Sequence, residues 1–162
     1  MIRFLTREEY ERTKPLAAAC FGDDEELERY YRQDVGENRV AVMEKDGRIV
    51  SMVQLRRFSA EYGDESVPVW YMLYVCTAPD CRGRGYMDAV MGFVLDTLRD
   101  EGEPFCFLVP VDEKIYAHLG FVYSWRFREE ERSMLYAEGY ESCYACLLGW
   151  ERFSPPERLR RG

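Results

Sequence analysis

The feature that most constrains this chain is a glycine-rich loop between a long apolar segment and an amphipathic one. Residues 67–77 (VPVWYMLYVCT) are almost continuously apolar and rich in β-branched and aromatic side chains, which predicts a central strand covered on both faces. Over residues 87–98 the apolar side chains recur at the three- and four-residue spacing of a helix with one buried face. Residues 82–85 (RGRG) separate the two. The sequence therefore predicts a strand, a tight turn and a helix in direct succession.

This loop has the properties of a phosphate-binding site. A helix N-terminus presents about four backbone N–H groups without intrahelical partners and roughly half a positive charge. Gly83 and Gly85 let a ligand approach the backbone, and Arg82 and Arg84 add guanidinium groups suited to phosphate. The loop does not match the dinucleotide-binding fingerprint, because the third glycine of that motif is missing. It does not match the P-loop either, because no Gly-Lys-Ser/Thr sequence follows. On these residues alone, a pyrophosphate-binding loop and a plain structural turn are equal alternatives.

Two motifs together resemble a known family. Residues 77–87 (TAPDCRGRGYM) resemble the acetyl-CoA-binding motif of the GNAT N-acetyltransferases, in which Gln/Arg-x-x-Gly-x-Gly/Ala follows a central strand. Arg82 takes the first place of that pattern and Gly85 the fourth, while Met87 stands where Gly or Ala is usual. Residues 108–121 (LVPVDEKIYAHLGF) resemble a strand–helix segment of the same family, closest to the N-terminal domain of its enhanced-intracellular-survival type.

The resemblance implies an α/β (α+β) fold, with a mixed, mostly antiparallel sheet that is splayed at its centre and flanked by helices. It extends over most of residues 1–127, and the core motifs lie in residues 67–127. A chain of 162 residues is long enough for one domain with its own core and too short for two comfortable ones. We therefore expect residues 1–162 to form a single GNAT-like acyltransferase domain.

The activity that the resemblance implies is direct transfer of an acetyl group from acetyl-CoA, used as a co-substrate, to a primary amine. The pantetheine arm would pair with the strand backbone, and the pyrophosphate would bind the amides of the loop. The predicted cofactor-binding residues are Val75, Cys76, Thr77, Arg82, Gly83, Arg84, Gly85, Tyr86 and Met87.

The family's tyrosine that serves the departing thiol corresponds to Tyr116, which is the predicted catalytic residue. An unperturbed tyrosine has a pKa of about 10 and a thiol a pKa of about 8.5, so full proton transfer to the thiolate is uphill. Tyr116 is better assigned as a hydrogen-bond donor to the sulfur. No general base is assigned, because Glu61, Asp64 and Glu65 form a carboxylate run of the kind that is usually just solvated.

Two alternatives stay open. The first is a non-catalytic GNAT-like domain that binds CoA or a protein partner. Met87 and the lack of an assigned general base favour this alternative. The second is an unrelated fold in which the loop is only a turn. The expected acceptor is a small-molecule or peptide amine that the sequence does not identify, and a homodimer is an open alternative to a monomer.

Composition narrows the classes of partner. The formal net charge of −8, from 30 acidic and 22 basic side chains, argues against nucleic acid, which requires a basic surface. No apolar run is long enough for a signal peptide or a membrane span, so we expect a cytoplasmic protein without a membrane partner. The single CxxC, Cys143 to Cys146, and the single histidine, His118, cannot supply four zinc ligands, so no metal is expected.

The remaining local signals predict further elements. Asp46-Gly47 predicts a hairpin between strands over residues 38–45 and 48–58. Thr6 and Glu9 form a capping-box pattern at the start of a helix. A helix is expected over residues 112–119, with Gly120 at its C-terminal cap. A short basic helix or tail is expected from Pro155 onward.

Overall fold

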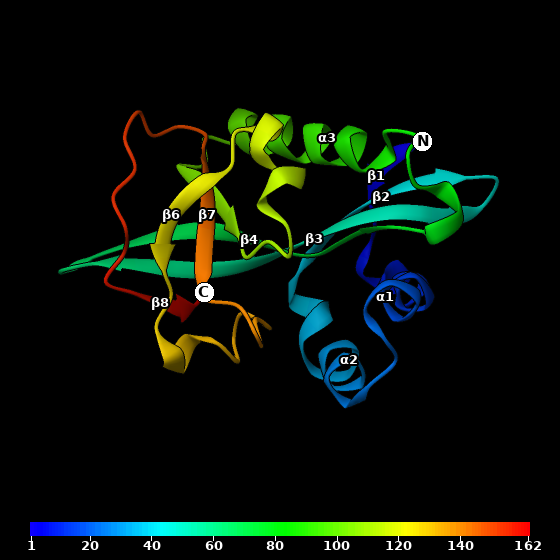
Figure 1. Ribbon diagram of the computed structural model, residues 1–162, viewed down its shortest axis with the longest axis horizontal. Coiled ribbons are helices and arrows are strands. Elements are labelled where there is room, and N and C mark those ends of the chain that lie inside the picture. The colour runs from blue at the N-terminus through cyan, green and yellow to red at the C-terminus, as the bar shows by residue number, and fades with distance from the viewer. The chain divides into compact units, whose positions relative to one another are not determined.

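The computed structural model describes all residues, 1–162. They include one mixed sheet of eight strands and three α-helices, which are labelled in Figure 1 where there is room. The strands are β1 (Ile2–Phe4), β2 (Arg39–Lys45), β3 (Arg48–Tyr62), β4 (Glu65–Thr77), β5 (Phe105–Leu108), β6 (Val122–Arg126), β7 (Ser142–Leu147) and β8 (Arg158–Arg161). The helices are α1 (Lys14–Phe21), α2 (Glu25–Arg29) and α3 (Tyr86–Asp100).

The strand order confirms the predicted fold class. It runs β1-β2-β3-β4-β5-β7-β6, and β8 pairs with β3. The β4–β5 pair is parallel, whereas β1–β2, β2–β3, β3–β8, β5–β7 and β6–β7 are antiparallel. Strand β4 has a neighbour on both sides, as its continuous apolar sequence predicts.

The chain divides into two compact units. Unit 1 comprises Met1–Leu55 and Tyr74–Leu95, and unit 2 comprises Arg56–Leu73 and Asp96–Gly162. Strands β3 and β4 and helix α3 contribute residues to both units. No helix combines the length and the hydrophobicity that a transmembrane span requires.

In unit 1, the β2–β3 hairpin forms as predicted. Its two turn residues, Asp46 and Gly47, have φ angles of +53° and +77°. A tight hairpin turn with positive φ at both central residues matches the right-handed twist of the flanking strands. Lys45 and Arg48, on either side of the turn, form the last pair of the hairpin.

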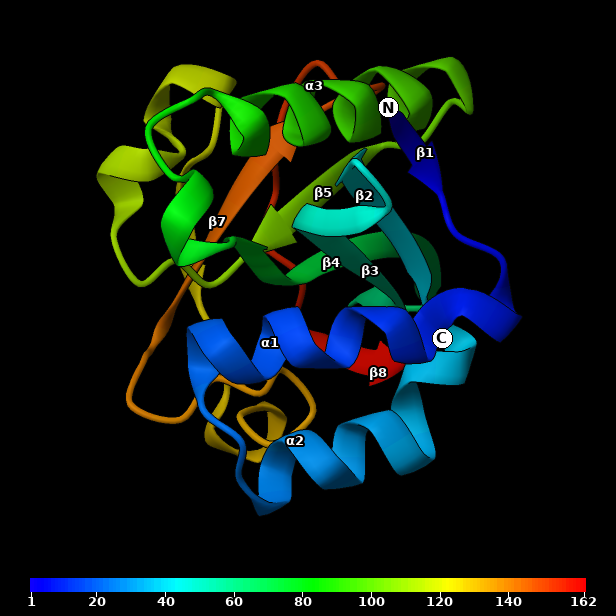
Figure 2. The same cartoon turned by 90° about the vertical axis from the view of Figure 1, so that its right-hand side faces the viewer.

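Helices cover both faces of the sheet in unit 1. Helices α1 and α2 lie on one side of β2 and β3, and the first turns of α3 lie on the other (Figures 1 and 2). On the α3 side, the rings of Phe4 and Phe93 are 5.2 Å apart. On the α2 side, the buried hydroxyl of Tyr30 bonds the Gln54 side chain and accepts a hydrogen bond of 2.7 Å from Asn38.

Helix α3 is held by its apolar face. The side chains predicted to face the core are buried at five positions: Val90, Met91, Val94, Leu95 and Leu98. Burial of such a side chain contributes about 1.5–3 kcal/mol. This helix, which follows the glycine-rich loop, is therefore fixed by packing from Val90 to Leu98.

The capping box at the N-terminus also forms, although the first turn is not α-helical. The Glu9 carboxylate accepts hydrogen bonds from the Thr6 backbone N–H at 3.0 Å and from its hydroxyl at 3.1 Å. Residues Arg7–Thr13 make 3₁₀ turns, and the α-helix begins at Lys14, with Pro15 in its first turn. Proline is tolerated at that position because its missing N–H would have no intrahelical acceptor there.

In unit 2, the helix predicted over residues 112–119 is confirmed only in part, because it is not one continuous α-helix. The segment forms two 3₁₀ turns, Glu113–Ile115 and Ala117–Leu119, with hydrogen bonds between residues three apart. The Asp112 side chain accepts from the backbone N–H of Lys114 at 3.0 Å, which favours a tight turn at this start. The predicted end is confirmed, because Gly120 has a φ of +97° in the left-handed region.

The prediction of a basic helix after Pro155 is wrong, because Arg158–Arg161 is the strand β8. It pairs antiparallel with Phe58–Glu61 of β3. Leu159 is buried while its neighbours Arg158 and Arg160 are exposed, which is the two-residue alternation of a strand. A free edge of β3 was available for pairing, and only the tertiary structure reveals that edge.

Candidate cofactor-binding site

The glycine-rich loop in unit 1 is open on its outer side. Gly83 and Gly85 have φ angles of +79° and +77°, a conformation that glycine adopts at no steric cost. A Cβ built on either glycine would meet no atom within 4 Å. Residues 82–85 are all exposed. The loop therefore turns sharply and presents its backbone to a ligand.

Helix α3 begins directly after this loop. Its first intrahelical hydrogen bond runs from the Ala89 N–H to the Gly85 carbonyl at 3.1 Å. The backbone N–H groups of Tyr86, Met87 and Asp88 therefore precede the ladder of intrahelical bonds and point out of the helix N-terminus. Together with the partial positive charge of the helix dipole, they can bind an anion.

The segment before the loop is anchored on both sides. The Ala78 N–H donates to the Val50 carbonyl at 2.8 Å, and the Cys81 N–H donates to the Ala78 carbonyl at 2.8 Å. The Arg48 guanidinium forms two hydrogen bonds of 2.8 Å with the Asp80 carboxylate and lowers the pKa of Asp80 to about 2. These contacts fix the entry to the loop, so its backbone is preorganised.

The cations near the loop are not all placed as the sequence suggests. Arg82 folds back, and its Nε donates to the Thr77 carbonyl at 3.2 Å. Arg84 and Lys45 flank Tyr86 and lower its pKa, because both cations favour the phenolate form. The Lys45 Nζ lies 5.3 Å from the centroid of the Tyr86 ring. Lys45 was missed by the sequence analysis, since only the hairpin brings it to the start of α3.

Strand β4 contains an unusual residue just before the predicted pantetheine-binding segment. Tyr74 has a φ of +49°, which is uncommon for a residue with a side chain. Its ring lies 4.7 Å from that of Tyr30 and 5.3 Å from that of Phe21. A left-handed residue within a strand interrupts the regular alternation of side chains. No local sequence signal marks this position, because tyrosine is an ordinary strand residue.

Residues Val75 to Thr77 follow this irregularity and end β4. Val75 and Thr77 are half-buried, and Cys76 is buried. The Ser51 hydroxyl donates to the Cys76 carbonyl at 3.1 Å and lies 2.9 Å from the Thr77 hydroxyl. The strand segment is thus fixed by β3 on one side.

A thiol missed by the sequence analysis lies at the end of this strand. The Cys20 sulfur is 3.4 Å from the Thr77 carbonyl and 3.9 Å from Nη2 of Arg82. A hydrogen bond from Cys76 and the nearby Arg82 charge lower the pKa of Cys20 to about 6. The pKa of Cys76 is raised, through its hydrogen bond to Cys20 and its burial.

Met87 and Tyr86 are the two remaining predicted cofactor-binding residues at the loop. Met87 is half-buried at the start of α3, so its side chain turns only partly into the core. Tyr86 is also half-buried, with its ring against Lys45.

Tyr116, the predicted catalytic residue, belongs to unit 2. It separates the two 3₁₀ turns and is 9% exposed. Its ring packs edge-on against Phe121 with centroids 6.0 Å apart. Its carbonyl accepts from the N–H of Leu119 at 3.0 Å. Backbone bonding and ring packing together fix the position of this side chain.

The carboxylates considered as bases also lie in unit 2. Glu61 is in β3, bonds the Ser66 hydroxyl and pairs with Arg160 at 3.2 Å. Asp64 is an exposed turn residue, and Glu65 begins β4. The structure therefore gives Glu61 a role in holding β8, and no base emerges from this group.

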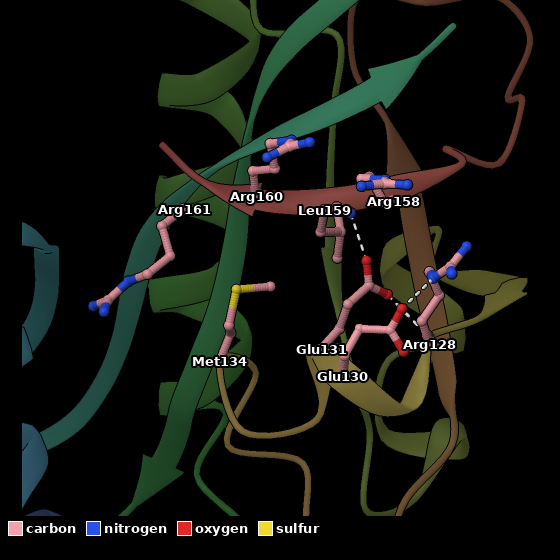
Figure 3. Close-up of a pocket in the computed structure, with 8 residues that line it drawn as sticks. All are labelled: Arg128, Glu130, Glu131, Met134, Arg158, Leu159, Arg160 and Arg161. Carbon is pink, nitrogen blue, oxygen red and sulfur yellow. Dashed lines mark hydrogen bonds and ion pairs between the residues drawn. The ribbon is translucent and has the colours of Figure 1, made fainter.

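A separate pocket in unit 2 is lined in part by the four residues of β8 (Figure 3). The residues that line it are Arg128, Glu130, Glu131, Met134, Arg158, Leu159, Arg160 and Arg161. Glu131 is only 3% exposed, and its carboxylate accepts hydrogen bonds from the backbone N–H groups of Arg128 and Leu159. Glu131, the last of three consecutive glutamates, therefore helps to hold β8. None of these residues is among the predicted site residues.

No cluster of three or more His, Cys, Asp or Glu side chains forms a metal-binding group anywhere in residues 1–162.

A family model described as an acetyltransferase (GNAT) domain matches residues 1–124. No curated protein matches the sequence.

Solved structures share the fold. Eis1 from Mycobacterium abscessus is 23% identical over 76% of this chain and 31% of its own, with a TM-score of 0.61. YhbS from Escherichia coli, solved in complex with CoA, is 17% identical over 100% of this chain and 89% of its own, with a TM-score of 0.77. A GNAT family acetyltransferase from Brucella melitensis, solved in complex with acetyl-CoA, is 15% identical over 100% and 95%, with a TM-score of 0.70.

The similar structures differ in length. The chain spans 31% of Eis1 and 32% to 33% of three other solved structures that it matches. It spans nearly the whole of the proteins from Escherichia coli and Brucella melitensis.

Proposed function

Because the chain belongs to the GNAT family of acetyltransferases, we propose that it transfers the acetyl group of acetyl-CoA directly to a primary amine. The observation that carries this proposal is the open backbone at Gly83 and Gly85, directly before the N-terminus of α3. Two proteins of the same fold were solved with CoA or acetyl-CoA, which supports the same choice of co-substrate. The acceptor amine would belong to a small molecule or a peptide.

In this proposal the backbone amides from Arg82 to Met87 bind the pyrophosphate of CoA. The helix dipole and the outward N–H groups of the first turn stabilise its charge. Arg84 and Lys45 add two side-chain cations beside Tyr86. Such local positive charge is needed because the whole chain carries a net charge of −8.

The pantetheine arm would lie along the end of β4, next to Val75, Cys76 and Thr77. Peptide-like arms of this kind bind by adding to the edge of a strand. The Thr77 carbonyl is engaged by Arg82 at 3.2 Å, so an arm that used this carbonyl would displace the guanidinium. A backbone N–H near Cys76 or Thr77 would stabilise the oxyanion of the tetrahedral intermediate.

Acetyl transfer forms a C–N bond and breaks the C–S bond of the thioester. We assign Tyr116 to the departing sulfur, to which its hydroxyl would donate a hydrogen bond as negative charge develops. The packing of its ring against Phe121 would keep that hydroxyl in one place. Tyr116 belongs to unit 2, whereas the glycine-rich loop belongs to unit 1.

A non-catalytic domain that binds CoA is the second candidate. It is favoured by Met87, a long side chain that is only half-buried at the position where the family pattern has Gly or Ala. Both candidates bind CoA, so binding alone does not separate them. Turnover does.

The test combines calorimetric titration with acetyl-CoA and an assay of free CoA released in the presence of a panel of primary amines. Catalysis predicts binding and amine-dependent CoA release. Binding without release for any amine in the panel would favour the non-catalytic candidate. Absence of binding would refute both.

A further inference from the structure

Two cysteines in unit 2 lie directly opposite each other in the sheet. Cys106 of β5 and Cys146 of β7 are register partners in an antiparallel pair. Directly opposed residues point to the same face, and their Cα atoms are about 4.5–5.5 Å apart. A disulfide requires a Cα separation of about 4.4–6.8 Å. The backbone therefore already has the spacing for a bond between these two sulfurs.

The two sulfurs differ in access. Cys106 is fully buried, with none of its surface exposed. Cys146 lines a cavity of about 250 Å³ together with Arg99, Gly120 and Ser124. A Cβ built on Gly120 would lie 3.4 Å from the Cys146 sulfur, so the absence of a side chain leaves this side uncovered. Only 2% of Cys146 is exposed, so the cavity admits small reagents only.

The charges around the pair favour a thiolate on the cavity side. A hydrogen bond from Cys106 and the adjacent Arg99 guanidinium lower the pKa of Cys146 to about 7. Burial raises the pKa of Cys106, so that thiol stays protonated. A thiolate is the nucleophilic form of cysteine, so the more accessible member of the pair is also the more reactive one.

We propose that Cys146 is a modification site for small hydroperoxides, and that Cys106 resolves the oxidised product as a cross-strand disulfide. The Cys146 thiolate attacks the terminal peroxide oxygen and the O–O bond breaks, which gives a sulfenic acid on Cys146. The leaving group is hydroxide from hydrogen peroxide, or alkoxide from an organic hydroperoxide. The Cys106 sulfur then attacks the Cys146 sulfur. The S–S bond forms, and the hydroxyl group leaves with the Cys106 proton as water.

Cys143 supplies a matched control within the same strand. It is buried like Cys106, but its register partner in β6 is Trp125 rather than a cysteine. Burial raises the pKa of Cys143, so it lacks both the partner and the thiolate. Cys20 and Cys76 form a second close thiol pair, in unit 1, so the readout must identify the linked residues.

The experiment treats the full chain with hydrogen peroxide at pH 7, blocks the remaining thiols, and maps disulfides by peptide mass spectrometry. We expect a Cys106–Cys146 crosslink that is reversed by reductant. Cys106→Ser should stop at a sulfenic acid on Cys146, which dimedone traps, and Cys143→Ser should behave as the wild type. Cys146→Ser should give no crosslink and no dimedone adduct on Cys106.

Two results would overturn the proposal. The first is a failure of peroxide to modify Cys146 while Cys143 or Cys106 is modified. The second is the absence of the crosslink in folded wild-type protein even though Cys146 forms a sulfenic acid. As a further check on the electrostatic argument, Arg99→Gln should slow the modification of Cys146 several-fold at pH 7, because it raises the pKa of this thiol. An unchanged rate would count against the proposed activation.

Discussion

The substitution Gly85→Asp tests the proposed pyrophosphate site most directly. Gly85 has a φ of +77°, and a Cβ there would project into open space. The new carboxylate would therefore enter the region where the diphosphate is proposed to bind. Two like charges about 4 Å apart repel by about 4 kcal/mol at the effective dielectric constant of a protein surface. Since 1.4 kcal/mol is a factor of ten, acetyl-CoA affinity should fall about a thousandfold.

Gly102→Asp is the matched control. Gly102 also has a φ of +77°, a Cβ there would also meet nothing within 4 Å, and it follows the other end of α3. Both variants bear the same conformational cost of a side chain at positive φ. An aspartate at the C-terminal end of a helix is additionally opposed by the helix dipole, so Gly102→Asp should be at least as destabilised as Gly85→Asp.

The assay is calorimetric titration with acetyl-CoA at low and at high salt, after thermal unfolding has shown that both variants are folded. We expect Gly102→Asp to bind as the wild type does and Gly85→Asp to lose most of its affinity. Part of the lost affinity should return at high salt, because ions screen an exposed charge. If a folded Gly85→Asp variant binds acetyl-CoA within tenfold of the wild type, the loop does not hold the diphosphate.

Three further predictions follow from named contacts. Tyr116→Phe should lower kcat about 10- to 100-fold with little change in acetyl-CoA binding, because it removes one hydrogen bond to the leaving sulfur; full turnover in steady-state kinetics would reject this role. Glu131→Ala should lower the free energy of unfolding by about 1–3 kcal/mol in urea titrations, because it leaves the N–H of buried Leu159 without its carboxylate acceptor; an unchanged midpoint would contradict it. Because Arg48 lowers the pKa of Asp80 to about 2, below its unfolded value of about 3.9, this pair should stabilise the fold above about pH 4 and lose that effect as the pH falls toward 2. The Tm difference between wild type and Asp80→Asn should accordingly be small at neutral pH, shrink with added salt and vanish near pH 2; a difference that persists near pH 2 would argue against the ion pair.

Local sequence patterns predicted much of the candidate site. The order of strand, glycine-rich loop and helix is set by side chains close in sequence, and the structure confirms it. The positive φ angles at Gly83 and Gly85 follow from the tight turn that must join β4 to α3. The assignment of Tyr116 came instead from resemblance to a family, and it stays a prediction.

The sequence did not predict the groups that surround the loop. Lys45 approaches Tyr86 only because the β2–β3 hairpin carries it there. The low pKa of Cys20 depends on contacts with Cys76 and Arg82, which lie far along the chain. No pattern within a window of a few residues encodes such contacts.

What the sequence by itself determined was the set of elements whose cause is local. Asp46-Gly47 specifies the hairpin turn, and the apolar period of residues 87–98 specifies α3, because turn conformation and amphipathicity depend on neighbouring residues. The tertiary structure decided the rest. Residues 158–161 became a strand because an edge of β3 could pair with them, and Cys106 met Cys146 through sheet register. Strand pairing joins residues distant in sequence, so its partners are fixed only when the whole chain packs.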